Sequence, residues 1–130
     1  MGLIAVLLAA VAGFATGAAW YMTLARPWMA AAGIEMGADG RPKGGSALPF
    51  VISGIAMLLV AGMMRHVFFM SGISGVFEGL VAGLGIGAFF ITPWVAMNYA
   101  YAMRPARLAV IDGGYAILGC GAIGLVLGLF

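Results

Sequence analysis

The side chains best able to do chemistry in this sequence are the few ionisable groups that lie in or beside long apolar runs. Asp112 lies inside the last such run and is followed by two glycines. Ionisable side chains are costly in hydrocarbon, so each one needs a partner or a function. We therefore expect a polar cluster around Asp112, as a structural ion pair or as a coupling site. Its candidate members lie on the same predicted side of the membrane: Arg104, Arg107, Asn98 and Tyr21.

A second set of ionisable residues flanks the short connection between the second and third apolar runs. Arg65 and His66 end the second run, and Glu78 begins the third. Because the connection is short, it brings these positions together, and we predict that Glu78 pairs with Arg65 or His66. Such a pair would close a helical hairpin, or it would form a proton or cation site.

No catalytic or metal-binding constellation is evident in the sequence. The chain has one histidine and one cysteine, Cys120. Met63, His66 and Met70 share a helical face that could hold Cu(I), but a chain with ten methionines places them there by chance more readily. We predict no enzymatic activity, no cofactor and no bound metal.

Composition sets the class of protein. Of the 130 residues, 65% are apolar and only 8% are charged. A soluble domain has roughly 25% charged residues, so the chain cannot cover a water-exposed surface. The net charge of +2 gives no indication of nucleic acid as a partner. The composition predicts a membrane protein forming one domain over residues 1–130, with the lipid bilayer as its surroundings.

Four charge-poor stretches are long enough to cross a hydrocarbon core of about 30 Å as helices. The predicted fold class is therefore all-α: a polytopic bundle of four transmembrane helices. The first connection should contain a short interfacial helix over residues 27–32 that Gly33 ends as a C-cap. Thr92-Pro93 should kink the third span. The predicted spans are about 2–25, 48–68, 77–100 and 107–129.

The basic residues predict the orientation of these spans. Only Arg65 lies near the second connection, whereas the first and third connections hold all the other basic side chains, Arg26, Arg41, Lys43, Arg104 and Arg107. Basic loops stay in the cytoplasm. We expect a multi-pass protein of the bacterial cytoplasmic (inner) membrane with both termini outside.

Glycines recur at four-residue spacing in the spans, as in Gly13-x-x-x-Gly17, Gly79-x-x-x-Gly83 and Gly124-x-x-x-Gly128. Such faces let helices approach closely, either inside one chain or between copies. There is also a weak internal echo: Tyr21 precedes Arg26-Pro27 as Tyr99 precedes Arg104-Pro105. A duplication of two helices would produce it, although the glycines of the two halves are offset.

Several short segments resemble a known family. The chain is similar to the bacterial membrane proteins grouped as domain of unknown function 1761, and the resemblance covers nearly the whole chain. It implies four spans and no established activity. The third span departs from the family's Trp-x-Gly-like element, because it has Thr-Pro-Trp-Val-Ala at residues 92–96. The segments that carry the resemblance are 17–21, 26–29, 33–34 and 107–115.

Two functions of different classes remain open. The first is an accessory or structural membrane subunit that packs with itself, as a homo-oligomer, or with a larger membrane complex. The second is a small oligomeric transporter or channel with a proton- or cation-coupled acidic residue. Since Asp112 and Glu78 both lie nearer the interfaces than mid-membrane, the first is favoured.

Overall fold

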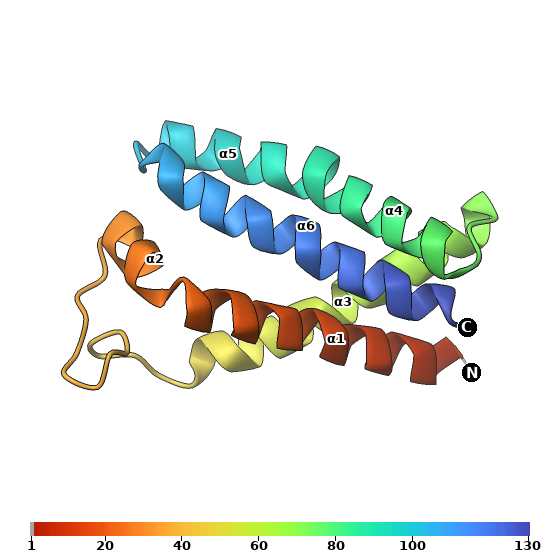
Figure 1. The fold of residues 1–130 in the computed structure, drawn as a ribbon, viewed down its shortest axis with the longest axis horizontal. Helices are drawn as coiled ribbons and strands as arrows, with labels where there is room; N and C mark the ends of the chain where they lie inside the picture. Colours follow the sequence, from red (N-terminus) through yellow and green to blue (C-terminus); the bar gives the residue numbers. More distant parts are fainter. Residues whose placement is uncertain (1) are drawn as a thin grey trace.

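The computed structural model describes residues 2–130 and is helical through every apolar run (Figure 1). Four helical segments are long and apolar enough to cross a membrane. Helices suit this setting because they satisfy their own backbone hydrogen bonds, which lipid cannot do. The predicted all-α fold of four transmembrane helices is therefore confirmed, and the chain is a multi-pass membrane protein. The spans are α1 (Gly2–Thr23), α3 (Leu48–Ser71), Val76–Tyr101 and α6 (Ala106–Gly128).

The outer surface of the spans is apolar. Leu3, Leu59 and Phe89 are 72%, 70% and 81% exposed, and they represent many similar side chains on all sides of the bundle. A surface of this kind would drive aggregation in water, whereas lipid tails solvate it without penalty. The buried residues are mainly small ones, together with a few larger side chains in a thin core between the helices.

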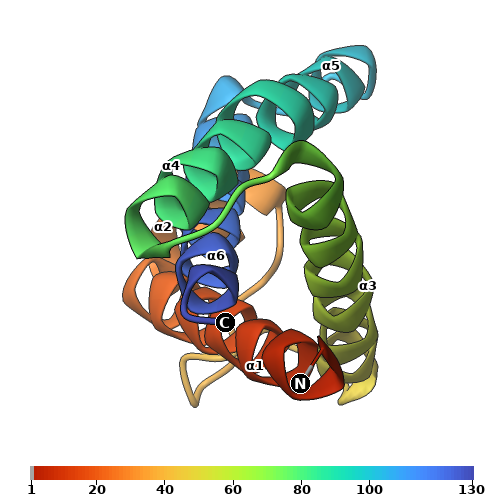
Figure 2. The same cartoon turned by 90° about the vertical axis from the view of Figure 1, so that its right-hand side faces the viewer.

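Helix α6 lies at the centre of the bundle (Figure 2). It packs against α1, against both halves of the third span and against the short helix α2 (Ala25–Ala32). Helix α3 packs mainly against α1 and touches α6 only slightly. The core where α1, α3 and α6 meet contains Ala9, Ala61 and Ile123, each at most 1% exposed. A side chain on α6 can therefore contact residues from several other helices at once.

Glycine faces explain how α6 and the third span come so close. A Cβ built on Gly83 would run into the backbone carbonyl of Cys120, and one on Gly79 would meet that of Gly124. In α1, a Cβ on Gly17 would meet the ring of Tyr115. These glycine faces are thus used for packing inside the chain, which was one of the two alternatives left open by their spacing.

The third span is interrupted by a π-helical turn. Helix α4 (Val76–Ile86) passes into the π-helical segment η1 (Gly87–Ile91) and then into α5 (Thr92–Tyr101). Pro93 has no N–H group, and the wider turn accommodates the missing hydrogen bond just before it. The Thr92 hydroxyl donates to the carbonyl of Gly87 over 2.7 Å. A π-helical turn thus precedes Thr92-Pro93, where a kink was predicted, and the kink itself stays a prediction.

The short helix predicted after the first span is also present, and it begins two residues earlier, at Ala25. Gly33 ends it in the left-handed conformation, with φ of 73°, as predicted for a C-cap. The remainder of the connection is irregular, apart from an isolated bridge between Met36 and Pro42.

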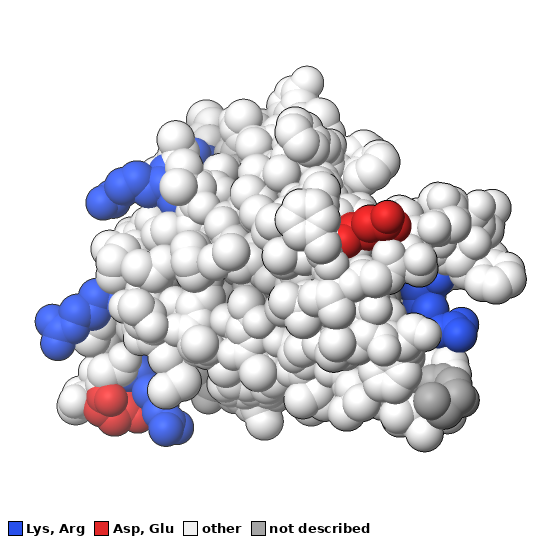
Figure 3. All heavy atoms as spheres, turned by 45° about the vertical axis from the view of Figure 1, so that its right-hand side comes forward, with Lys and Arg blue, Asp and Glu red and all other residues white. Residues whose placement is uncertain are grey.

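The start of α1 and the end of α6 lie at one end of the bundle, and α2 lies at the other (Figure 1). Most Lys and Arg side chains also gather at the α2 end (Figure 3). The basic side chains of the first and third connections thus lie at the same end of the bundle, as the sequence predicted. The side of the membrane that each end faces stays a prediction.

Candidate functional site

The carboxylate of Asp112 is the centre of the most polar site within the spans. Asp112 is the seventh residue of α6 and is half-buried. Its Oδ1 accepts hydrogen bonds from the Tyr21 hydroxyl at 2.6 Å and from Trp28 Nε1 at 3.2 Å. Its Oδ2 accepts one from the Tyr99 hydroxyl at 2.6 Å. We call Asp112, Tyr21, Trp28 and Tyr99 the Asp112 cluster.

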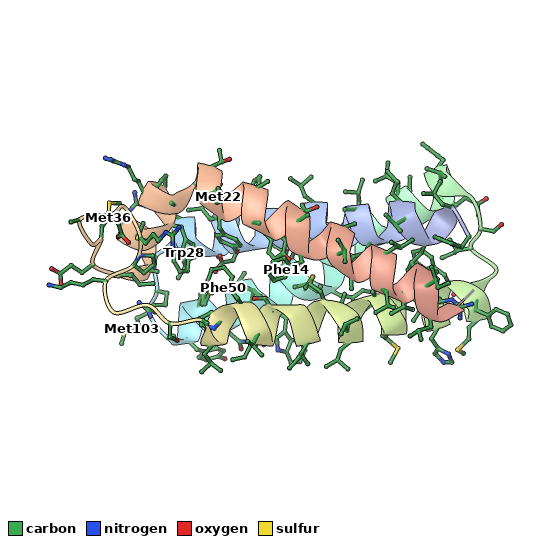
Figure 4. The ribbon with its side chains drawn as sticks, turned by 90° about the horizontal axis from the view of Figure 1, so that it is seen from below. Phe14, Met22, Trp28, Met36, Phe50 and Met103 are labelled. Carbon is green, nitrogen blue, oxygen red and sulfur yellow. The ribbon has the colours of Figure 1, made fainter. Side chains whose placement is uncertain are left out.

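Each donor of the Asp112 cluster comes from a different helix. Tyr21 lies in the last turn of α1, Trp28 in α2 and Tyr99 in α5. Figure 4 shows Trp28 at the α2 end of the bundle, while Met22 points to the outside of α1. The cluster therefore joins the ends of three helices to a single side chain of α6.

Aromatic packing fixes the orientation of the donors. The ring of Tyr21 meets Trp28 edge-on at a centroid distance of 5.7 Å and Tyr115 at 5.5 Å. Such edge contacts stabilise beyond the area they bury. Tyr115 in turn donates to the carbonyl of Gly13 over 3.0 Å. The ring contacts of Tyr21 therefore fix the direction in which its hydroxyl points toward the carboxylate.

Helix α2 is docked next to the Asp112 cluster by a small apolar core. Ala31, Ala32 and Leu108 are buried there, with Tyr99 packed against them. Arg104 Nη1 donates to the Ala32 carbonyl at 2.9 Å and so satisfies one of the orphan acceptors at the end of α2. Arg104 therefore supports the site from outside without touching Asp112.

Backbone carbonyls of α6 beside Asp112 also accept side-chain hydrogen bonds. Trp20 Nε1 donates to Ile111 O at 2.8 Å, and the Thr92 hydroxyl approaches Gly113 O at 3.2 Å. Gly113 and Gly114 allow this, because a Cβ there would meet Thr92 or Trp20. Together with the Asp112 cluster they form a polar layer across the α2 end of the bundle.

Only one of the predicted partners of Asp112 is found in contact with it. Tyr21 is present, as predicted. Arg104 binds Ala32 O instead, and the side chains of Arg107 and Asn98 are exposed. Among residues 2–130, no basic side chain lies within 4.0 Å of the Asp112 carboxylate. The predicted polar cluster is therefore present through Tyr21, whereas the arginine alternative is wrong, because neutral aromatic donors from three helices occupy both oxygens.

Trp28 and Tyr99 were not assigned to the cluster from the sequence. Trp28 resembled an ordinary residue at headgroup depth. Tyr99 had a usable signal, since it precedes Arg104-Pro105 by the same spacing that separates Tyr21 from Arg26-Pro27. The structure brings these two tyrosines to opposite oxygens of one carboxylate.

The predicted pairing of Glu78 with Arg65 or His66 is wrong. Glu78 is exposed, and its Oε2 accepts a hydrogen bond from the backbone N–H of Ser74 at 3.2 Å. The residues that the structure describes contain one salt bridge, between Lys43 and Glu35 at 3.4 Å, where both side chains are exposed. Glu78 lies in the first turn of α4, where a free N–H and the helix dipole favour a carboxylate locally.

Arg65 takes a different neighbour. Its guanidinium lies where a Cβ on Gly2 would be, at the start of α1. His66 is exposed on the same end of α3. The turn between α3 and α4 thus joins the end of one helix to the start of the next, but Glu78 of α4 forms no salt bridge with Arg65 or His66 of α3.

The arrangement can hold a negative charge near one end of the bundle by means of neutral donors. Within residues 2–130, no three His, Cys, Asp or Glu side chains are grouped so that they could hold a metal ion.

The comparisons with known proteins give a single result. No curated protein and no solved structure matches the chain. A family model, described as "Protein of unknown function (DUF1761)", matches residues 4–128. That range includes the four spans, apart from the first two residues of α1, and every residue of the Asp112 cluster. The chain therefore belongs to the DUF1761 family.

Proposed function

We propose that this chain is an accessory or structural membrane subunit that packs with itself or with a larger membrane complex. The observation that carries the proposal is the incomplete packing of α3. Over 24 residues this helix buries only Ala61, Met64 and Phe68, whereas the 23 residues of α6 include eight buried positions. It makes no extensive contact with α4, η1 or α5.

The glycines of α3 support the same proposal. A Cβ added at Gly54 or Gly62 would meet no other atom within 4 Å, unlike the glycines between α4 and α6. Glycine lowers helix stability, so it is expected where a close helix approach needs it. A further helix, from a second copy or from a larger subunit, would use these two positions.

The saturation of Asp112 is the second support. Its two oxygens accept three hydrogen bonds from Tyr21, Trp28 and Tyr99. A coupling carboxylate has to exchange its partners during transport, whereas a structural one keeps them. The arrangement favours a role in holding the helices together.

Purification from native membranes tests the proposal. In a mild detergent, the tagged wild-type chain should migrate in a complex larger than its monomer. Gly54→Leu and Gly62→Leu should release the monomer without lowering its unfolding temperature. The matched control is Gly85→Leu on α4, where a Cβ also meets open space, and it should leave the complex intact. Recovery of the wild-type chain only as a monomer, without a partner, would contradict the proposal.

A small oligomeric transporter or channel is the second candidate, and one observation favours it. Asp112 is only half-buried, and the π-helical segment η1 lies one hydrogen bond away through Thr92. π-helical turns occur often at functional sites. The path would have to form between copies, because four helices enclose little space.

The variant Asp112→Asn separates the two candidates. As a structural residue, it should lower the unfolding temperature modestly and leave proton flux into liposomes unchanged. As a coupling residue, it should abolish a proton-linked flux that the folded wild-type protein shows. A pH-sensitive dye inside the liposomes provides the measurement, and we expect the structural outcome.

A further inference from the structure

Most basic residues at the α2 end of the bundle have no acidic partner. Among residues 2–130, only Lys43 has a carboxylate within 4.0 Å. Arg26 and Arg107 are exposed, at the first turns of α2 and α6. Since Asp112 is occupied by neutral donors, these guanidinium groups are free to bind an external anion.

A groove on the outer surface between α1 and α6 runs toward this end. Its volume is about 470 Å³, and it is lined by Leu118 of α6 and by residues of α1 and the following turn, Thr16, Ala19, Trp20, Thr23 and Leu24. All but Leu118 lie within three turns of the end of α1 that leads into Arg26. The groove thus begins within the span and ends at Leu24, two residues before Arg26.

The polar atoms that line the groove are already satisfied. The hydroxyls of Thr16 and Thr23 each donate to a carbonyl four residues earlier in α1 at 2.7 Å. Trp20 Nε1 donates to Ile111 O. An occupant would therefore meet methyl groups, methylenes and an indole ring, which suits a hydrocarbon chain better than a polar solute.

The helical repeat places Arg107 above the groove. Arg107 and Leu118 are eleven residues apart, three full turns, so they share a face of α6 and differ in height by about 16 Å. Ile111 and Gly114 lie between them on that face, and Trp20 reaches both: its Nε1 donates to the Ile111 carbonyl, and its ring lies where a Cβ on Gly114 would be. The height matches one leaflet, which is half of a hydrocarbon core of about 30 Å.

We propose that this groove binds one anionic phospholipid, with an acyl chain along Trp20 and Leu118 and the phosphate at Arg107 and Arg26. Arginine recognises phosphate through paired N–H donors. Two guanidinium groups without carboxylate partners favour a lipid with net negative charge over a zwitterionic one. The second surface groove, between α1 and α3, provides a comparison, because its lining residues on α1, from Leu7 to Ala15, lie further along the chain from Arg26.

The test measures lipid binding to the purified full-length chain in neutral detergent, by native mass spectrometry and by thermal unfolding. Phosphatidylglycerol and phosphatidylcholine with identical acyl chains are the probes. Wild-type protein should bind phosphatidylglycerol more tightly, and Arg107→Gln and Arg26→Gln should each weaken that binding about five-fold. Arg65→Gln, at the opposite end, is the matched control and should have no effect.

A substitution inside the groove tests the acyl chain. Ala19→Phe fills the groove and should reduce phosphatidylglycerol binding as strongly as Arg107→Gln. Ala15→Phe fills the other groove from the same helix and should leave binding unchanged. Equal affinity for the two lipids, or equal losses in Arg65→Gln and Arg107→Gln, would overturn the proposal, because diffuse attraction would then explain the binding. Displacement of the lipid by an equal concentration of inorganic phosphate would also overturn it.

A measurement on the wild-type protein tests the site without depending on whether the variants fold. Phosphatidylglycerol with brominated acyl chains should quench the tryptophan fluorescence more than brominated phosphatidylcholine at the same mole fraction, because Trp20 lines the groove. Trp94 on α5 is exposed, and its fluorescence should respond to both lipids alike. Equal quenching by the two lipids would refute the site.

Discussion

Tyr21 and Tyr99 are the residues that make Asp112 acceptable within a span. Each donates a hydrogen bond of 2.6 Å to a different oxygen of the carboxylate. Hydrogen bonds to a charged group are stronger than neutral ones, and the loss of one donor leaves a charge partly unpaired. The stability of the α2 end should therefore depend on two hydroxyl groups.

Tyr99→Phe removes one of these hydroxyls and should lower the free energy of unfolding in detergent by about 1 kcal/mol. Thermal or denaturant unfolding followed by circular dichroism measures the change. Tyr101→Phe is the matched control, because Tyr101 lies two residues further in α5 and is 86% exposed. If both variants lose the same stability, the hydroxyl of Tyr99 does not hold the carboxylate.

Glu78 should act through its own helix and independently of Arg65. Glu78→Gln removes a charge from the first turn of α4 and should reduce stability by about 0.5 kcal/mol. In a double-mutant cycle with Arg65→Gln, the coupling energy should be close to zero, since the two side chains do not pair. A clear favourable coupling between the two positions would restore the ion pair that the sequence predicted.

The packing of α6 against the third span is the main interaction at the level of elements. Backbone approaches backbone at Gly79, Gly83 and Gly87, so that van der Waals contacts of the main chain replace side-chain packing. The other face of the same span is open, as Gly85 demonstrates. Helix α4 thus has two glycines two residues apart, Gly83 where an added side chain would clash and Gly85 where it would not.

Gly83→Ala should destabilise the chain strongly, by about 3 kcal/mol, because the new methyl group would meet the carbonyl of Cys120. This is the upper end of the range of about 1–3 kcal/mol for overpacked cores. Gly85→Ala should be neutral or stabilise by up to about 1 kcal/mol through helix propensity. The unfolding temperatures of the two variants in detergent give the comparison. Similar behaviour of the two would mean that α4 and α6 are not in close contact.

The whole molecule is asymmetric in charge along the direction of its helices. The basic connections lie at the end that carries α2, and the start of α1 and the end of α6 lie opposite (Figures 1 and 3). The positive-inside rule then predicts that the α2 end faces the cytoplasm. The groove proposed for an anionic lipid would open toward the same leaflet.

Cysteine labelling checks this orientation. In a Cys120→Ala background, Ala38→Cys in the long connection should react with an impermeant maleimide only after the membrane is permeabilised. Phe130→Cys, at the other end and 55% exposed, should react in intact cells. Labelling of both positions from outside would contradict the predicted topology, and labelling of Ala38→Cys alone would reverse it.

Local properties of the sequence determined the four spans and the short helix ended by Gly33, and Pro93 indicated that the third span would not be a regular α-helix. Hydrophobicity, missing N–H groups and left-handed glycines act over one or a few turns, so neighbouring residues suffice to predict them. The polarity of Asp112 was likewise enough to indicate that it needed partners.

Only the tertiary structure decided which partners these are. Tyr21 and Trp28 lie 91 and 84 residues from Asp112 along the chain, and they reach it because α1 and α2 dock onto α6. Arginines closer in sequence were the natural expectation, but the close packing of the helices placed aromatic donors at the carboxylate. A hydrogen-bond partner depends on how helices rotate and approach one another, and in lipid that is set by small-residue contacts spread over the whole bundle.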